Sequence, residues 1–180
     1  MEKMKKLIMF VVLCLCFVNV ANAQTGICQY KETDIESLNG RMVLKSTKRP
    51  INGVICSYYT SGKLLNEFPH KDGKREGVRR VYYESGKLMG ETPYKDDKVE
   101  GVLRVYFETG KLNIETPYKN HKREGYERIY YVTGQLRAQI LYKNDEPISG
   151  ACGDRGALTN AELTNWANGG SVSFLCTPQR

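Results

Sequence analysis

The sequence has few of the elements that enzymes use for catalysis. It contains only two histidines, His70 and His121, and one tryptophan. It has no Gly-x-Ser-x-Gly element, no phosphate-binding glycine loop and no metal-ligand spacing such as Cys-x-x-Cys. The two histidines occupy nonequivalent positions of the repeat described below. Because catalysis needs a convergent nucleophile, base or metal ligand, we expect no catalytic residue, no metal, no cofactor and no enzymatic activity.

Long hydrophobic runs are also scarce, and the one present is close to the N-terminus. Three lysines precede an apolar stretch from Leu7 to Val18, and Ala21-Asn22-Ala23 follows it. About 12 to 14 apolar residues are too few to span a bilayer comfortably, whereas this arrangement is typical of a secretory signal peptide. We therefore predict that residues 1–23 are cleaved and that the protein is exported, either to a periplasm or as a secreted protein.

Cysteine is limited to four residues once the predicted signal peptide is removed. They are Cys28, Cys56, Cys152 and Cys176. An even number outside the cytosol favours disulfides over metal ligation, and three pairings are possible. We favour Cys152 with Cys176, because both flank a compact C-terminal segment, and this leaves Cys28 to pair with Cys56.

Charge of neither sign is concentrated in one segment. The formal net charge is +7, and the charged residues are spread along the chain. Such a surface helps solubility and tolerates anionic partners, but it does not by itself indicate nucleic acid binding. We therefore expect no nucleic acid partner.

Two series of glycines reveal an internal repeat of 24 residues. The first series is Gly53, Gly77, Gly101 and Gly125, and the second is Gly62, Gly86, Gly110 and Gly134. Each unit is rich in valine and tyrosine and is interrupted by Ser-Gly or Thr-Gly, which predicts a β-hairpin. Glycine and proline in every unit disfavour helix. Because a lone hairpin is marginal in water, we predict a mostly β fold: a single elongated antiparallel sheet of stacked hairpins.

The pairing within a hairpin follows from its turn. A two-residue turn at Ser85-Gly86 places Tyr83 opposite Leu88 and Arg80 opposite Glu91. Alternation then predicts one apolar core face and one face of arginine, tyrosine and glutamate. The expected core residues are Val81, Tyr83, Leu88, Thr92, Val105, Phe107, Leu112, Thr116, Ile129, Tyr131, Leu136 and Ile140. The recurring prolines cannot donate to a ladder, so we expect strands of about five or six residues that end before them.

The chain divides into a signal peptide (1–23), an N-terminal cap (24–48), the repeat array (49–150) and a disulfide-linked C-terminal cap (151–180). The C-terminal cap includes a predicted short helix from Thr159 to Gly169, with Thr159 or Asn160 at its N-cap. We expect Trp166 to pack over the end of the sheet and residues 171–176 to form a last strand.

The arginine and tyrosine face is our candidate for partner binding, because these residue types are favoured at interface hot spots. The candidate residues are Tyr58, Arg80, Tyr82, Arg104, Tyr106, Arg128 and Tyr130. The alternative is a purely structural ladder of Arg–Glu pairs, worth about 0 to 1 kcal/mol each when exposed. The expected partner is another protein. The recurring lysines of the turns favour a second candidate, an anionic membrane surface or envelope polymer.

The unit Gly-x-x-x-x-Tyr-Tyr-x-x-Gly-Lys-Leu…Tyr-Lys-x-x-Lys-x-Glu-Gly resembles the MORN repeat family over residues 53–150. It is similar above all to the bacterial variant of YwqK-type antitoxin proteins. The resemblance implies stacked β-hairpins, protein binding and sometimes contact with anionic lipid, and the antitoxin relation implies neutralisation of a partner toxin. Since this chain has an export signal and cysteines, we expect an interaction protein of the cell envelope or exterior with an immunity-like role.

Overall fold

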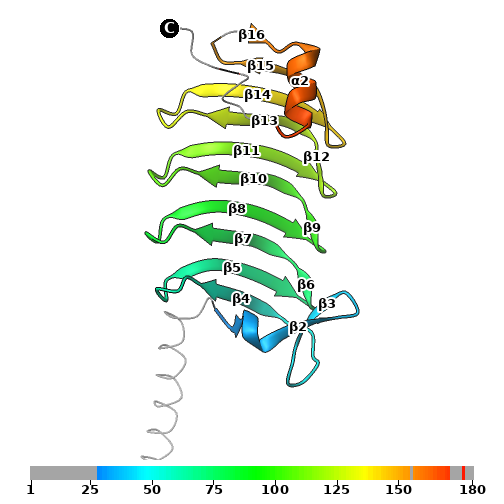
Figure 1. Cartoon of the computed structure of the whole chain (residues 1–180). Coiled ribbons are helices and arrows are strands. Elements are labelled where there is room, and N and C mark those ends of the chain that lie inside the picture. The colour runs from blue at the N-terminus through cyan, green and yellow to red at the C-terminus, as the bar shows by residue number, and fades with distance from the viewer. Residues whose placement is uncertain (1–27, 155, 171–175, 177–180) are drawn as a thin grey trace, which may run out of the picture.

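The computed structural model describes residues 28–154, 156–170 and 176. Four hairpins follow one another and form one continuous antiparallel sheet (Figure 1). Their strands are β4 (Gly53–Tyr58), β5 (Leu64–Lys71), β7 (Gly77–Tyr82), β8 (Leu88–Lys95), β10 (Gly101–Tyr106), β11 (Leu112–Lys119), β13 (Gly125–Tyr130) and β14 (Leu136–Lys143). The predicted fold class, stacked hairpins in one large sheet with a C-terminal helix, is confirmed.

Shorter elements complete the sheet between the hairpins and at its two ends. Two-residue strands pair with the end of the preceding long strand: β6 (Lys74–Arg75), β9 (Lys98–Val99) and β12 (Lys122–Arg123). At the N-terminal end, β1 (Tyr30–Lys31) pairs in parallel with β4, and a short 3₁₀ helix (Glu32–Asp34) leads to a separate hairpin of β2 (Ile35–Leu38) and β3 (Arg41–Leu44). At the C-terminal end lie β15 (Glu146–Cys152), β16 (Gly156–Ala157) and α2 (Asn160–Ala167).

The turn inside each hairpin differs from the predicted two-residue turn. In the second hairpin, the Tyr83 N–H donates to the Lys87 carbonyl and the Gly86 N–H donates to the Tyr83 carbonyl. Tyr82, not Tyr83, is therefore paired with Leu88, and a bulge separates this pair from the next. The physical reason is that both favoured two-residue turns, types I′ and II′, need positive φ at the first central residue, and here only the second, Gly86, has it. Beyond the bulge the predicted register holds, with Arg80 opposite Glu91.

The recurring prolines lie inside the sheet, so the expectation that strands end before them is wrong. Pro93 is within the eight-residue strand β8 and is paired with Val78. On its other side the Pro93 carbonyl accepts from the Glu100 N–H, where the next strand jogs away before Gly101. Because the nitrogen and the carbonyl of one strand residue point to the same side, the missing proline N–H faces this interruption of the ladder. Gly101 is required there, because its φ is +111° and a Cβ would lie 3.2 Å from the Pro93 ring.

The buried core lies at the two ends of the sheet. At the C-terminal end, Ile129, Ala138 and Ile140 are buried beneath α2 and Cys176. At the N-terminal end, the β2–β3 hairpin covers the first repeat. The apolar face predicted from alternation is thus a true core only near these caps, since Val81 and Val105 in the middle are half-buried. A single sheet layer has nothing to cover its central repeats.

The C-terminal cap forms as the sequence predicted over its described part. The Thr159 hydroxyl accepts from the Glu162 N–H and the Glu162 carboxylate accepts from the Thr159 N–H, which is a capping box at the start of α2. Gly169 has φ +87° after the helix. Trp166 packs against the C-terminal core and its indole N–H donates to the Tyr142 hydroxyl. The predicted signal peptide (1–23) lies outside the described residues, and of the predicted strand at 171–176 only Cys176 is described.

Two disulfides close the caps onto the sheet, in the pairing that the sequence favoured. Cys28 is bonded to Cys56 in β4, and Cys152 in β15 is bonded to Cys176. Within the described part of the chain, no helix combines the length and apolarity required to cross a bilayer.

The Cys152–Cys176 bond closes a sequence separation of 24 residues over the C-terminal core. We expect replacement of both cysteines by alanine to lower the free energy of unfolding by about 3 kcal/mol, because the unfolded chain gains loop entropy. Urea denaturation of the oxidised protein, followed by circular dichroism, measures this loss. An unchanged midpoint would show that the bond does not hold the cap on the folded array.

Candidate functional site

Arginine and glutamate alternate in one continuous row across the sheet. Each residue of the row is paired with the next through the strand register. In spatial order the row is Glu67, Arg80, Glu91, Arg104, Glu115 and Arg128. We call the side of the sheet that carries this row the ladder face, and the opposite side, on which α2 and the β2–β3 hairpin pack, the capped face. At the N-terminal end of the ladder face, Cys56 is paired with Glu67 and disulfide-bonded to Cys28, and Glu67 is buried.

The three arginines of the row are not equivalent. The Arg80 guanidinium lies 3.2 Å from Glu91 and 3.9 Å from Glu67, and that of Arg128 lies 3.0 Å from Glu115. Within the described residues, Arg104 has no carboxylate within 4.0 Å and no hydrogen-bond partner. The predicted cross-strand ladder therefore exists, but its central guanidinium is left available for another partner.

A row of tyrosines runs beside the charged row. The Tyr106 hydroxyl donates to Glu91 at 3.3 Å, and the Tyr130 hydroxyl donates to Glu115 at 3.1 Å. Burial, followed by the neighbouring carboxylates, raises the pKa of Tyr82, Tyr106 and Tyr130. These hydroxyls therefore stay protonated donors at neutral pH.

Tyr58 begins the same row but differs from its equivalents. It is exposed and makes no hydrogen bond within the described chain. The strand beside it is β1, which pairs with β4 only at Tyr30 and Lys31, so no glutamate of a preceding repeat is present. All seven predicted partner-binding residues thus belong to the ladder face, and Tyr58 stands at its margin.

A third row, which sequence reasoning missed, is apolar. Valines and prolines pair across each hairpin on the ladder face, as in Val54–Pro69, Val78–Pro93 and Val102–Pro117. In the last repeat Tyr126 and Leu141 take these positions. The sequence signal for this row was the proline that recurs in each repeat, but we interpreted that proline as the end of a strand. The ladder face consequently has three parallel stripes: apolar, charged and tyrosine.

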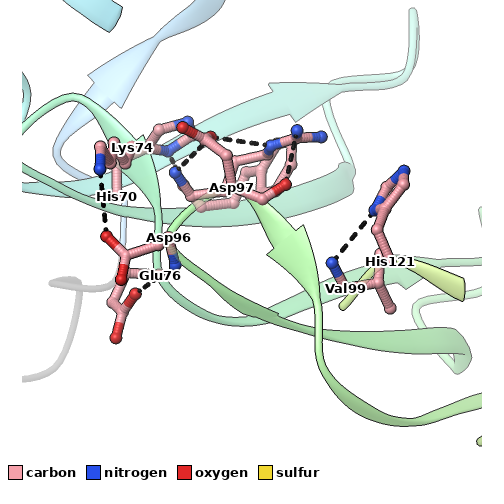
Figure 2. Close-up of polar contacts among 9 residues, drawn as sticks. His70, Lys74, Glu76, Asp96, Asp97, Val99 and His121 are labelled. Atoms are coloured by element: carbon pink, nitrogen blue, oxygen red, sulfur yellow. Dashed lines mark hydrogen bonds and ion pairs between the residues drawn. The ribbon is translucent and has the colours of Figure 1, made fainter. Parts of the chain in front are cut away.

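The edge formed by the turns between hairpins is a self-contained network. Both central residues of these turns have positive φ, for example Asp96 and Asp97. The Asp97 carboxylate accepts from the Arg75 N–H at 2.9 Å and from its guanidinium at 3.0 Å, while the Asp96 N–H donates to Glu76 (Figure 2). His121 takes the place of Asp97 one repeat later and accepts from the Val99 N–H at 3.2 Å. We call this network the turn ladder.

The other histidine, His70, belongs to a pocket at the N-terminal cap. A cavity of about 710 Å³ lies between the β2–β3 hairpin and the first repeat, with Phe68, His70, Arg75 and Asp97 in its wall. Burial lowers the pKa of His70, and its Nδ1 lies 2.9 Å from the Phe68 carbonyl. The ring is therefore neutral with Nδ1–H as a donor. The pocket suits an apolar group, and the structure keeps His70 and His121 in separate environments.

Beneath α2, a buried carboxylate is held by hydroxyls. The Thr116 hydroxyl donates to Glu127 at 2.8 Å, and both residues are buried on the capped face. Burial raises the pKa of Glu127 against the opposing effects of Thr116, Arg123 and Tyr142. Burial also raises the pKa of Tyr142 to about 12, and Tyr142 accepts from the Trp166 indole N–H. This network ties the helix to the sheet, and sequence reasoning did not find it.

Comparison with protein families accounts for the repeated geometry. Four consecutive segments match the model of the MORN repeat variant, at residues 51–72, 75–96, 99–120 and 123–144. Residues 51–144 are an array of MORN repeats. Such repeats are generally non-catalytic binding repeats. No curated protein matches the chain. Across the described ranges, no group of three or more His, Cys, Asp or Glu side chains is placed to hold a metal ion.

The buried Glu127 gives the MORN array a specific pH signature. Because the folded pKa is raised, folding favours the protonated acid, so this group's contribution to stability falls as pH rises from the ordinary carboxyl value of about 4.3 through the folded pKa. We expect Glu127→Gln to gain stability relative to the parent protein over that window and to keep the gain at neutral pH. Thermal unfolding of both proteins across the acid range measures the difference.

Asp97 and Asp145 have lowered pKa values, so they have the opposite effect and destabilise the fold as pH falls. This effect is the same in the parent protein and in Glu127→Gln, so it cancels in the difference between their stabilities. A difference between the two proteins that does not change with pH would contradict the raised pKa. Thr116→Val is the companion variant. It is expected to cost about 1–3 kcal/mol at neutral pH, because it leaves the carboxylate without its donor.

Proposed function

We propose that this chain is an exported, non-enzymatic scaffold that binds another protein through the ladder face. The observation that carries the proposal is the free guanidinium of Arg104 at the centre of a broad face lined with tyrosine. Arginine and tyrosine provide much of the binding energy in protein interfaces, where they dock into desolvated pockets of the partner. The hydroxyls of Tyr106 and Tyr130 are held by glutamates, so little side-chain entropy is lost on binding.

The size of the ladder face fits a protein partner. Its four hairpins supply eight strands, which span about 34 Å at about 4.8 Å between neighbours, and six residues of strand span about 20 Å. The resulting area of about 700 Å² is close to the roughly 800 Å² that each partner contributes to a standard interface. The hollow that Val78, Pro93, Val102 and Arg104 line on this face has a volume of about 230 Å³, which is below the roughly 300–1,000 Å³ of typical small-molecule sites.

Export and an immunity-like role extend the same proposal. Two disulfides are typical of proteins that fold in an oxidising compartment. Neutralisation of a partner protein, as the antitoxin resemblance implies, is one outcome of binding through a rigid surface.

The proposal predicts that Arg104→Ala and Tyr106→Ala each weaken capture of the partner by about 30-fold, which corresponds to a hot-spot loss of about 2 kcal/mol. Pull-down from envelope extract with the disulfide-bonded protein, followed by mass spectrometry, measures the capture. Lys87→Ala is the matched control, because Lys87 is exposed at a hairpin tip away from the ladder face. Equal recovery of the same proteins by all three variants would remove the ladder face as the binding surface.

A second candidate, attraction to an anionic membrane or envelope polymer, has support from the turn edge. Exposed lysines end the second strand of every hairpin: Lys71, Lys95, Lys119 and Lys143. In the described chain, Lys95 and Lys119 make no ion pair. Each lysine near an anionic surface contributes about 1 kcal/mol of attraction.

Vesicle binding separates this candidate from protein binding. We expect the parent protein to sediment with phosphatidylserine vesicles at low salt, to be released at high salt and to ignore neutral vesicles, because counterions screen exposed charges. Lys95→Glu with Lys119→Glu should abolish the binding, whereas Arg104→Ala should retain most of it. Equal sedimentation with anionic and neutral vesicles would exclude the electrostatic candidate.

A further inference from the structure

We propose that the partner of the ladder face is a second copy of this chain, docked face to face and antiparallel about a two-fold axis. This inference rests on the proposed function, since it names the protein that the ladder face binds. It comes from the order of charges in the row. The four central charges, Arg80, Glu91, Arg104 and Glu115, alternate along the row and are partly exposed, whereas Glu67 at its end is buried. A row with an even number of alternating charges becomes its own complement when it is reversed.

The two-fold axis runs along the strand direction, between β8 and β10. Rotation by 180° about this axis places the strands of the second copy in reversed order opposite those of the first. Each residue of the second copy keeps its height along the strand direction. Glu91 then faces the partner's Arg104, and Arg80 faces the partner's Glu115. Each of these four charges meets its opposite, and the two Arg104 residues, which have no ion-pair partner in the described part of one chain, each gain one beside the axis.

The other two stripes support the same axis. Because positions along the strands are kept, the apolar stripe of one copy packs on the apolar stripe of the other, and the tyrosine rows also meet. An axis along the array instead places each acid on an acid and the apolar stripe on the tyrosines. Relief of that repulsion needs a shift by one strand, which no longer closes as a two-fold and leaves end charges unpaired.

The energetic roles of the stripes differ. Ion pairs at an interface fix orientation and suppress wrong arrangements more than they supply affinity. Burial of Val78, Pro93, Val102 and Pro117 against their counterparts removes half-buried apolar surface from water. The area of about 700 Å² on each copy is in the range that a specific dimer needs. The charged row therefore sets the register, and the apolar stripe with the tyrosines holds the copies together.

A charge exchange within one chain tests the register. Arg80→Glu alone and Glu115→Arg alone each create two like-charge contacts in the symmetric dimer, so we expect each to raise the dimer dissociation constant at least tenfold. In the combined variant the four central positions read acid, acid, base, base. That order is unfavourable within one sheet but fully complementary to a reversed copy, so its dissociation constant returns to within about threefold of the parent value.

Sedimentation velocity of the disulfide-bonded protein measures these constants at about 0.1 M and 1 M salt, where screening lengths differ about threefold. Lys87→Glu and Glu108→Arg are matched reversals at exposed hairpin tips and should leave the dimer unchanged. A parent protein that stays monomeric at tens of micromolar, or a combined variant no tighter than the single ones, overturns the dimer. Pull-down that still depends on Arg104 would then leave the proposed function standing with a different protein partner.

Crosslinking covers the case in which the exchange variants do not fold. Val102 lies on β10 beside the axis, so Val102→Cys brings two thiols close together across the dimer. Val78→Cys lies on β7, one strand farther from the axis, and faces the partner's Pro117 instead of its own copy. A short bis-maleimide should link Val102→Cys into dimers and leave Val78→Cys largely monomeric. Equal linkage of the two variants, or none, overturns the antiparallel register.

Discussion

Hydrogen bonds between successive turns are the contact on which the array depends, because the strands of successive hairpins share only two paired positions at each junction, β5 with β7, β8 with β10 and β11 with β13. The Asp97 N–H donates to the Arg75 carbonyl at 3.0 Å, and the Asp97 carboxylate accepts from the Arg75 N–H. Asp145 repeats both bonds with Arg123. These backbone groups lie where the strand ladder is interrupted, and groups that are shielded from water must find partners. The turn ladder supplies them and fixes the spacing of the repeats.

Contacts between repeats leave the two ends and one face of the sheet without a covering layer. The two caps cover them in different ways. At the C-terminal end, Trp166, Tyr142, Glu127 and Thr116 form a buried polar chain that attaches α2 to the sheet. At the N-terminal end, the β2–β3 hairpin encloses apolar residues and leaves the pocket beside His70. Core formation is therefore local, and the central repeats are stabilised mainly through their neighbours.

Period and alternation made the hairpins, their order and the Arg80–Glu91 register predictable, since these depend on contacts that are local in sequence. The turn at Ser85-Gly86 was mispredicted because the number of residues with positive φ, which decides the turn type, is not visible in residue names. Pro93 was mispredicted because its missing donor faces a jog made by Gly101, a long-range coincidence. The sequence identified Arg104 as a candidate binding residue because it is an arginine of the repeat, but only the structure shows that it lacks the ion pair that Arg80 has.

The two ladders of this protein divide structure from recognition. In the turn ladder each charge is bound to backbone, as Asp97 is to Arg75, so its bonds are complete within one chain. On the ladder face the charges pair with one another, at 3.0 Å or more, and with tyrosine hydroxyls, and their order carries the information. Alternation cancels the long-range field, so this face does not attract an arbitrary anion; it discriminates by register at short range. A surface of this kind is suited to a partner that is itself periodic at the spacing of β-strands.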